Sequence, residues 1–285
     1  KMNAYVRNIT AMLIFGSVGL FVQAIPLSSS EIVAARTVLG SLFLCGMLVI
    51  RRQQPDWAAL KKNLPMLIVT GIVMGLNWMF LFAAYQYTSV SVATLIYYCA
   101  PVIVLFLSPF LLREKLTWPK LAGIAGALIG MVLVNGTQTG GVDPQKGLVC
   151  GLLAAAFYAG LILLNKRITN VPATEKTLVQ LLSAAVVMGA YALTTHSGPW
   201  ELPQGSGLLA LLIIGFVHTG IAYLLYISSM SELPGQTVAL CSYIDPASAL
   251  IFSAIFLHEH LTVLQLLGAV LILGGSAFGE LYRKK

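Results

Sequence analysis

The sequence is poor in charge. Only 9% of its 285 residues are Asp, Glu, Lys or Arg, whereas 58% are apolar and the mean hydropathy is +0.87. A soluble domain carries about a quarter charged residues, so this chain has too few of them to cover a water-facing surface. The length alone would allow two soluble domains. The composition excludes them and indicates that lipid is the main solvent.

Signatures of catalysis are also lacking. The sequence has no P-loop and no Gly-x-Ser-x-Gly elbow, and its few His and Cys residues do not show metal-ligand spacing. The four cysteines lie within apolar segments, where free cysteine packs as a small hydrophobe: Cys45, Cys99, Cys150 and Cys241. We therefore expect no catalytic residue, no metal and no cofactor, and a protein that is not an enzyme.

What the chain does have is a series of apolar segments with the length needed to cross a bilayer, about 17 to 25 residues. Backbone polar groups in hydrocarbon must pair within their own segment, which favours helices. The sequence thus predicts an all-α polytopic membrane protein with ten transmembrane helices. We expect them at 8–25, 31–50, 63–86, 89–112, 117–136, 146–165, 174–195, 206–230, 235–257 and 262–282.

The net charge of +7 reports topology and does not indicate a nucleic-acid partner. With the N-terminus placed inside, nearly all Lys and Arg residues of the loops lie on the cytoplasmic side, and Lys146 is the exception. This is the positive-inside bias. It predicts a multi-pass protein of the plasma (inner) membrane with both termini in the cytoplasm. We expect the first helix to be uncleaved, although Val22-Gln23-Ala24 loosely imitates a signal-peptide cleavage site.

An internal repeat organises the chain. The segment 112–117, Leu-Arg-Glu-Lys-Leu-Thr, returns at 257–262 as Leu-His-Glu-His-Leu-Thr, an offset of about 145 residues that extends in both directions. Half of ten spans is five, an odd number, so the second copy must enter the membrane from the opposite side. We therefore predict two inverted five-helix repeats, at 1–140 and 141–285, related by a pseudo-two-fold axis in the membrane plane.

The repeated Glu114 and Glu259 resemble catalytic residues, but their setting favours a structural role. Each precedes a Leu-Thr that opens a helix. Thr117 and Thr262 are natural N-caps, and a carboxylate near a helix N-terminus is stabilised by the helix dipole. The alternative is a gate contact at each mouth of a transport path.

Ionisable residues inside the spans are better candidates, because charge in a membrane is costly and usually faces a cavity or a partner. Arg36 lies about two turns into the second span, His218 within the eighth and Asp245 within the ninth. We assign coupling or gating roles to these three. Asp245 could also bind and release a proton or counter an ammonium group. Its equivalent in the first repeat is Ala100, so the feature breaks the symmetry.

Pro101 and Pro246 occupy equivalent mid-span positions. Proline removes a backbone bond and kinks a helix, and paired interruptions in two halves point to a midplane binding site with these prolines as hinges. Polar and aromatic residues within the spans, Tyr226 among them, can line such a site and stack on an organic substrate. The predicted substrate-binding residues are Asn77, Trp78, Tyr97, Tyr98, Tyr158, Tyr223, Tyr243 and Asp245.

At these residues the chain resembles the EamA-like family of the drug/metabolite transporter superfamily. The resemblance rests on the two Pro-(x)n-Glu-x-Leu-Thr-(x)n-Gly segments, 101–123 and 246–268, and on Arg36 in Ala34-Ala35-Arg36. Arg113 and His258 stand where the family would have glycine. The resemblance implies ten helices, a central cavity between spans one to four and six to nine, peripheral spans five and ten, and alternating access, often in an exporter.

Together these features predict a secondary transporter that exports a small organic metabolite: an amino acid, an amine or quaternary ammonium compound, or a drug-like solute. Its partners would be that solute and the lipid bilayer, with protons as a candidate coupling ion. GxxxG pairs at 71–75, 126–130 and 147–151 favour close packing within a monomer, with a homodimer contact through span five or ten as the alternative. Two other functions stay open: a non-transporting membrane receptor or scaffold, and an importer of a cationic metabolite such as choline.

Overall fold

The structure is a computed structural model that describes residues 3–52, 55–88, 90–135, 142–198, 201–256, 258 and 262–281. Within these ranges the regular structure is helical and contains no strand. The elements are α1 (Ala4–Gly16), α2 (Val18–Val22), α3 (Ser29–Ile50), α4 (Trp57–Tyr87), α5 (Val90–Tyr97), α6 (Ala100–Leu111), α7 (Trp118–Asn135), α8 (Pro144–Asn165), α9 (Ala173–Thr195), α10 (Gly205–Ile213), the π-helix η1 (Ile214–Ile221), α11 (Ala222–Met230), α12 (Gly235–Cys241), α13 (Ile244–Phe256) and α14 (Val263–Leu281).

Nine helices or runs of helices in the described ranges are long and apolar enough to cross a membrane. Short elements join into single spans: α1 with α2, α5 with α6, α10 with η1 and α11, and α12 with α13. The expected fifth span corresponds to α7, whose apolar stretch Trp118–Val134 is shorter than the others. The multi-pass all-helical architecture is confirmed, whereas the count of ten crossings stays a prediction.

Side-chain caps fix where several helices begin. Ser28 and Glu31 form a capping box at the start of α3. The Asp143 carboxylate accepts a bond from the backbone N–H of Lys146 at the start of α8, and this bond lowers the pKa of the Asp143 carboxyl. The Thr262 hydroxyl accepts from the third residue of α14 at 3.2 Å, as expected of an N-cap. Glu259 lies outside the described residues.

Two spans are broken near their middles. The chain leaves the helix at 98–99, between α5 and α6, and again at 242–243, between α12 and α13. Pro101 and Pro246 lie in the first turn after these breaks, where the missing N–H of proline costs no intrahelical bond. The breaks occupy equivalent positions of the two sequence copies.

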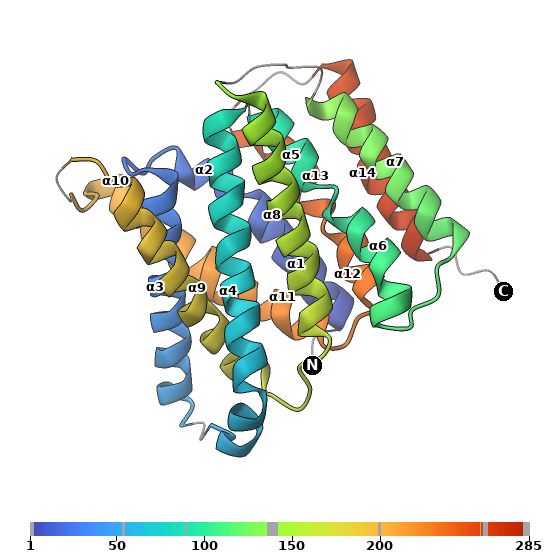
Figure 1. Cartoon of the computed structure of the whole chain (residues 1–285). Helices are drawn as coiled ribbons and strands as arrows, with labels where there is room; N and C mark the ends of the chain where they lie inside the picture. The colour runs from blue at the N-terminus through green and yellow to red at the C-terminus, as the bar shows by residue number, and fades with distance from the viewer. Residues whose placement is uncertain are drawn as a thin grey trace.

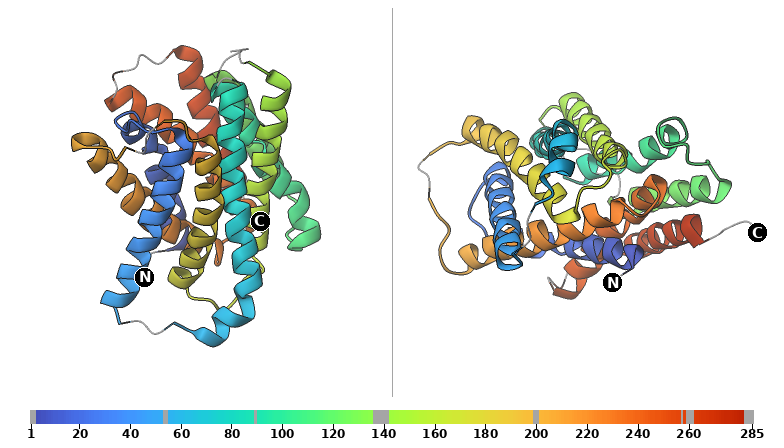
Figure 2. Two further views of the ribbon diagram at one scale, coloured as in Figure 1. Left: turned by 60° about the vertical axis from the view of Figure 1, so that its left-hand side comes forward. Right: turned by 90° about the horizontal axis from the view of Figure 1, so that it is seen from below.

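The helices α7 and α14 form a pair that stands at one edge of the molecule (Figure 1; Figure 2). Glycine allows them to approach closely, because a Cβ at Gly130 would lie 2.5 Å from the carbonyl oxygen of Gly268 and one at Gly123 would lie 2.5 Å from that of Gly275. The glycines at 71 and 75 pack on α9, and those at 147 and 151 on Thr88 and α5. All three GxxxG pairs therefore lie against other helices of the same chain.

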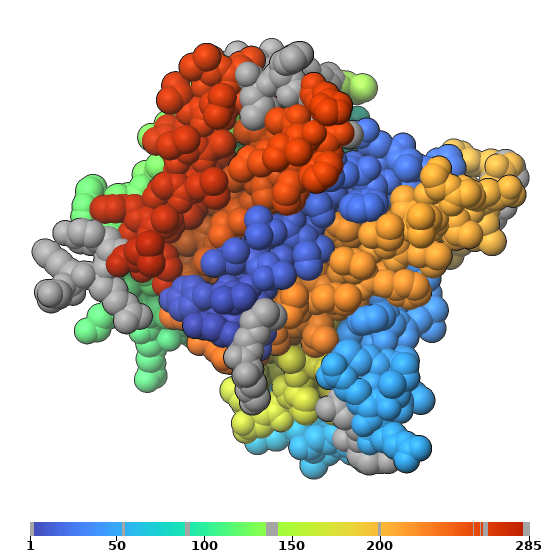
Figure 3. Space-filling view, turned by 180° about the vertical axis from the view of Figure 1, so that it is seen from behind, coloured from blue at the N-terminus to red at the C-terminus, as the bar shows by residue number. Residues whose placement is uncertain are grey.

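The remaining helices surround the interior. The helix α4 packs against α8 and α9, and α3 packs against α9 and η1. From behind, α1 runs between the C-terminal segment and the α10–α11 region (Figure 3), consistent with its packing on α13 and α11. The helices of the two sequence copies thus interleave.

The bundle has two ends, which we call the N-terminal face and the opposite face. Arg7 pairs with Glu232 at the N-terminal face. At the opposite face the backbone N–H of Asp143 donates to the carbonyl of Tyr87 at 3.1 Å. The N-terminal face is therefore marked by Arg7 and Glu232, and the opposite face by Tyr87 and Asp143.

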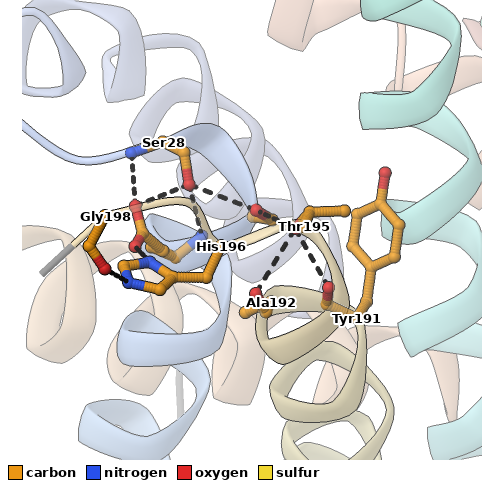
Figure 4. Close-up of polar contacts among 8 residues, drawn as sticks. Ser28, Tyr191, Ala192, Thr195, His196 and Gly198 are labelled. Atoms are coloured by element: carbon orange, nitrogen blue, oxygen red, sulfur yellow. Dashed lines mark hydrogen bonds and ion pairs between the residues drawn. The ribbon is translucent and has the colours of Figure 1, made fainter. Parts of the chain in front are cut away.

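His196 clamps α9 to α3 at the opposite face (Figure 4). Its Nδ1 lies 2.6 Å from Oε1 of Glu31 and its Nε2 lies 2.6 Å from the carbonyl oxygen of Gly198. Next to it, the hydroxyls of Thr195 and Ser30 are 2.9 Å apart. The clamp ties the end of α9 to the beginning of α3.

Candidate functional site

A cavity of about 660 Å³ lies inside the bundle. Ligand sites that hold small organic molecules have volumes of about 300 to 1,000 Å³. Its deep part lies at the middle of the spans, around Arg36 and Asp245. From there it extends toward the opposite face along Val22 at the end of α2, Ser29 at the start of α3 and Tyr85 near the end of α4. The cavity is therefore directed to one end of the molecule.

Arg36 reaches the cavity from the second turn of α3. Its guanidinium carbon lies 4.9 Å from the centroid of the Trp78 ring, a cation–π geometry. Its Nε is buried and has no hydrogen-bond partner. The guanidinium also interacts with the Tyr223 hydroxyl, and its remaining donors are suited to an anionic ligand group.

Asp245 reaches the cavity from the first turn of α13, just after the break that precedes this helix. The Tyr98 hydroxyl donates to its Oδ2 at 3.1 Å. Tyr98 is itself held, because the hydroxyl of Tyr243 donates to its backbone carbonyl at 3.0 Å. The two breaks thus lie against each other, and together they present the carboxylate to the cavity.

Aromatic rings form much of the wall between the two charges. Tyr97 and Tyr158 stack with centroids 5.3 Å apart and planes inclined by 16°. The Tyr158 hydroxyl lies 2.9 Å from that of Tyr226. Trp78 meets Tyr223 edge to face at 5.4 Å. Each Tyr or Trp side chain supplies a rigid apolar ring and a polar group at the edge of that ring.

Arg36 and Asp245 interact electrostatically across this cavity but form no direct ion pair with each other. A cation and an anion on separate walls can hold a ligand that carries both charges. The aromatic rings between them can contact an apolar group on the same ligand. The arrangement is suited to binding a small molecule and to discriminating between charged and neutral groups on it.

The structure brings most of the predicted site residues together. Those that line the cavity are Arg36, Trp78, Tyr97, Tyr98, Tyr158, Tyr223, Asp245 and Pro246. Tyr226, noted in the sequence as a mid-span aromatic, lines it as well.

Four predicted residues lie behind the wall. Asn77 donates to the carbonyl of Ala154 at 2.8 Å, and the Tyr97 hydroxyl lies 3.4 Å from Asn77 Oδ1. Asn77 thus connects α4, α8 and the wall. Tyr243 is fully buried and acts through its bond to Tyr98. Pro101 is buried in α6 and is not among the lining residues.

His218 is the fourth predicted residue that does not line the cavity. It lies in the π-helix η1, with Nε2 2.9 Å from the Ser17 hydroxyl and its ring 5.2 Å from that of Phe21. Ser17 is the residue at which α1 gives way to α2. His218 therefore contacts a helix break without lining the cavity, and π-helical turns often mark functional positions.

Sequence reasoning missed several lining residues. Phe15, Ser29, Tyr85 and Thr94 line the outer and middle parts of the cavity. Met131 on α7 also lines it, so the fifth span contributes to the site as well as standing at the edge. A mid-span aromatic such as Tyr85 carried a usable signal, whereas the contribution of α7 depends on helix packing that no local pattern reports.

Among the described residues no group of three or more His, Cys, Asp or Glu side chains could hold a metal ion. The candidate site therefore consists of the charged side chains of Arg36 and Asp245 and the aromatic rings that line the cavity with them.

Comparisons with known proteins found one family model, related transporters and a solved structure of the same fold. The model described as "EamA-like transporter family" matches residues 3–136 and again 145–278. The chain is 31% identical over 283 residues to a Bacillus subtilis (strain 168) protein described as "Uncharacterized transporter YxxF", covering 97% of this chain and 89% of that protein. It is 28% identical over 241 residues to an Escherichia coli (strain K12) protein described as "Probable amino-acid metabolite efflux pump", covering 79% and 80%. A solved crystal structure shares the fold, with a TM-score of 0.87 at 21% identity over 98% of this chain and 97% of that one.

Proposed function

The chain belongs to the EamA-like transporter family, as both of its matched segments indicate, and from that premise we propose that it carries a zwitterionic organic metabolite by alternating access. Its relatives are transporters, which makes the chain a membrane transporter for small molecules. The class of solute proposed is an amino acid or a close derivative with an apolar or aromatic side chain.

One observation carries this proposal: Arg36 and Asp245 face one aromatic-walled cavity without pairing with each other. A carboxylate suits the guanidinium, whose fork of donors matches its two oxygens. An ammonium suits the Asp245 carboxylate and the ring faces nearby. A solute with only one of these charges leaves the other buried group with its aromatic partners, such as Tyr98 for Asp245 or Trp78 for Arg36, and without an opposite charge.

The names of two relatives support the same class of solute. Proteins of Salmonella typhimurium and Escherichia coli are each described as "Probable amino-acid metabolite efflux pump". We extend this to export across the plasma membrane by the present chain, with both termini in the cytoplasm. The opposite face would then be external, and the cavity would be directed to the outside.

The transport cycle proposed uses two inverted halves, residues 1–140 and 141–285, which rock around the site with Pro101 and Pro246 at the hinges. Asp245 is the candidate site for a coupling proton, since the same carboxylate faces the solute. A monomer or a homodimer is compatible with this cycle, because the cavity is built from one chain.

Two alternatives make different predictions. An importer of a cationic metabolite such as choline would use Asp245 and the rings, but Arg36 in the same cavity opposes a lone cation. A non-transporting receptor or scaffold would bind a ligand without flux.

The proposal is tested with purified protein and three matched ligands: phenylalanine, phenethylamine and 3-phenylpropanoate. They share the ring and differ only in which charges they carry. Ligand binding raises the unfolding temperature by mass action, so the zwitterion should stabilise the protein at the lowest concentration. A larger shift with phenethylamine than with phenylalanine would favour the cationic alternative. No shift with phenylalanine and other neutral amino acids would contradict the zwitterion.

A further inference from the structure

The connection between α11 and α12, together with the helix ends that flank it, is held by side chains from several other helices; we call this segment, residues 229–237, the inner turn. It lies at the N-terminal face, away from the direction in which the cavity extends, and none of its residues lines the cavity. It receives contacts from Arg7 and Asn8 in α1, Ser108 in α6, Glu114 in the α6–α7 connection, Lys166 after α8, Lys176 in α9 and Glu280 in α14.

Glu114, the acidic residue of the repeated motif, makes the most direct of these contacts. Its Oε1 accepts from the backbone N–H of Gly235 at 2.6 Å, and its Oε2 accepts from that of Gln236 at 3.0 Å. The Gln236 side chain donates in turn to the Ser108 hydroxyl at 2.6 Å. A Cβ at Gly235 would lie 2.9 Å from Leu112 Cδ1 and 3.4 Å from Glu114 Oε1. The carboxylate and the inner turn therefore fit closely.

Two lysines hold the other end of the inner turn. The Lys166 ammonium donates to the carbonyls of Met230 at 3.0 Å and Leu233 at 2.5 Å. Burial lowers the pKa of Lys166, and the negative charge of Glu114 opposes that shift. Lys176 is buried and donates to the carbonyl of Asn165 at 3.1 Å. These contacts place cations at helix C-termini, where the dipole favours them.

We propose that Glu114 is a gating residue, which holds the inner turn across the N-terminal end of the cavity through its two backbone hydrogen bonds. The inference rests on the alternating access proposed above. Access from the N-terminal face requires the helices that meet at the inner turn to separate, and the charge-assisted bonds of Glu114 join the first sequence copy to the second there. Weakening them shifts the population toward the state open at the N-terminal face.

Two single-cysteine proteins test whether Glu114 holds the N-terminal end of the cavity closed. In the first, native Cys241 is retained and Cys45, Cys99 and Cys150 are replaced by serine. Cys241 is the buried last residue of α12, and the negative charge of Glu280, near the end of α14 at the N-terminal face, acts on its thiol. In the second, all four native cysteines are replaced and Thr94→Cys places the thiol in the cavity. The measurement is the rate at which a water-soluble maleimide labels each protein in detergent.

Glu114→Gln, introduced into both proteins, should raise the labelling rate at position 241 about fivefold or more and lower it at position 94. Lys115→Gln is the matched control, because Lys115 is exposed in the same connection and should leave both rates unchanged. Gly235→Ala should act in the same direction as Glu114→Gln, since the added methyl group presses on Leu112 and the carboxylate.

Opposite changes at the two positions distinguish gating from simple loosening, which would raise both rates. Increases at both positions, or no change at either, would overturn the assignment of Glu114. Flux measured on the wild-type protein separates this from the proposed function. If opposite changes occur but wild-type liposomes show no flux of any solute tested, the gate assignment stands and the transport proposal fails. If flux occurs and the labelling rates do not change, the transport proposal stands and the gate assignment fails.

Discussion

The hydroxyl of Tyr98 donates to Oδ2 of Asp245 at 3.1 Å, and this bond joins the interruption in one sequence copy to the interruption in the other. The repeat equivalent of Tyr98 is Tyr243, whose own hydroxyl donates to the Tyr98 carbonyl at 3.0 Å. Equivalent residues thus play different parts: one faces the cavity and touches its carboxylate, and the other supports it from behind. The asymmetry lies beside a position where the two copies differ in charge, Ala100 in the first and Asp245 in the second.

Tyr98→Phe should weaken binding of the zwitterion by about tenfold, corresponding to about 1.4 kcal/mol, because the Asp245 carboxylate loses the hydrogen bond that positions it. The ring and its packing would remain. Titration calorimetry on purified protein measures the change. Tyr243→Phe is the control, since it removes a bond to a backbone carbonyl outside the cavity and should lower stability more than affinity. Equal losses of affinity in both variants would contradict the separate roles.

Arg36→Lys should retain the positive charge but lose the planar fork that stacks on Trp78 at 4.9 Å. We expect affinity for the zwitterion to fall by about tenfold, corresponding to about 1.4 kcal/mol, and to fall further in Arg36→Gln. Binding of the matched amine should weaken less or improve in Arg36→Gln, since the opposing charge is gone. Titration calorimetry measures both affinities in each variant. If the ratio of zwitterion affinity to amine affinity is the same in the variants as in the wild type, Arg36 does not recognise the carboxylate.

The sequence indicated the membrane class, the helix positions and the charged and aromatic residues of the cavity, because these depend on apolar length and on in-span polarity. Local sequence patterns could not show that Trp78 lines the cavity and that Asn77 lies behind its wall. Adjacent residues point about 100° apart on a helix, and only the packing of α4 decides which of them faces the cavity. The partner of Glu114 was equally hidden. Its carboxylate was expected to be stabilised by the dipole of the helix that follows it, with a gate contact as the alternative, whereas it accepts from the backbone N–H of Gly235, 121 residues away.

Gly130→Ala should destabilise the protein by about 1–3 kcal/mol, the usual cost of overpacking, because its Cβ would lie 2.5 Å from the Gly268 carbonyl oxygen. Gly126→Ala is the matched control on the same helix. Its Cβ would first meet an atom at 3.7 Å, an ordinary contact, so its unfolding temperature should stay near that of the wild type. Thermal unfolding in detergent compares the two, and similar temperatures for both variants would contradict the close α7–α14 packing.

His196→Ala should lower the stability of the protein by about 1 kcal/mol. Both ring nitrogens of His196 face acceptors, Glu31 Oε1 and the Gly198 carbonyl, each at 2.6 Å. Alanine removes both contacts, including the one that joins the end of α9 to the beginning of α3. Unfolding temperatures of wild type and variant in detergent test this prediction. Equal unfolding temperatures for the two proteins would contradict a stabilising role of His196.

The most direct test of the two-charge cavity is counterflow of a labelled neutral amino acid into liposomes that contain the protein and an excess of the unlabelled compound. The wild-type protein should accumulate label transiently. Asp245→Asn and Arg36→Gln should each reduce the initial rate by about tenfold or more, the loss of about 1.4 kcal/mol or more of recognition, while remaining folded and monodisperse. Counterflow that both variants sustain at the wild-type rate, at every pH tested, would contradict a zwitterion bound between Arg36 and Asp245.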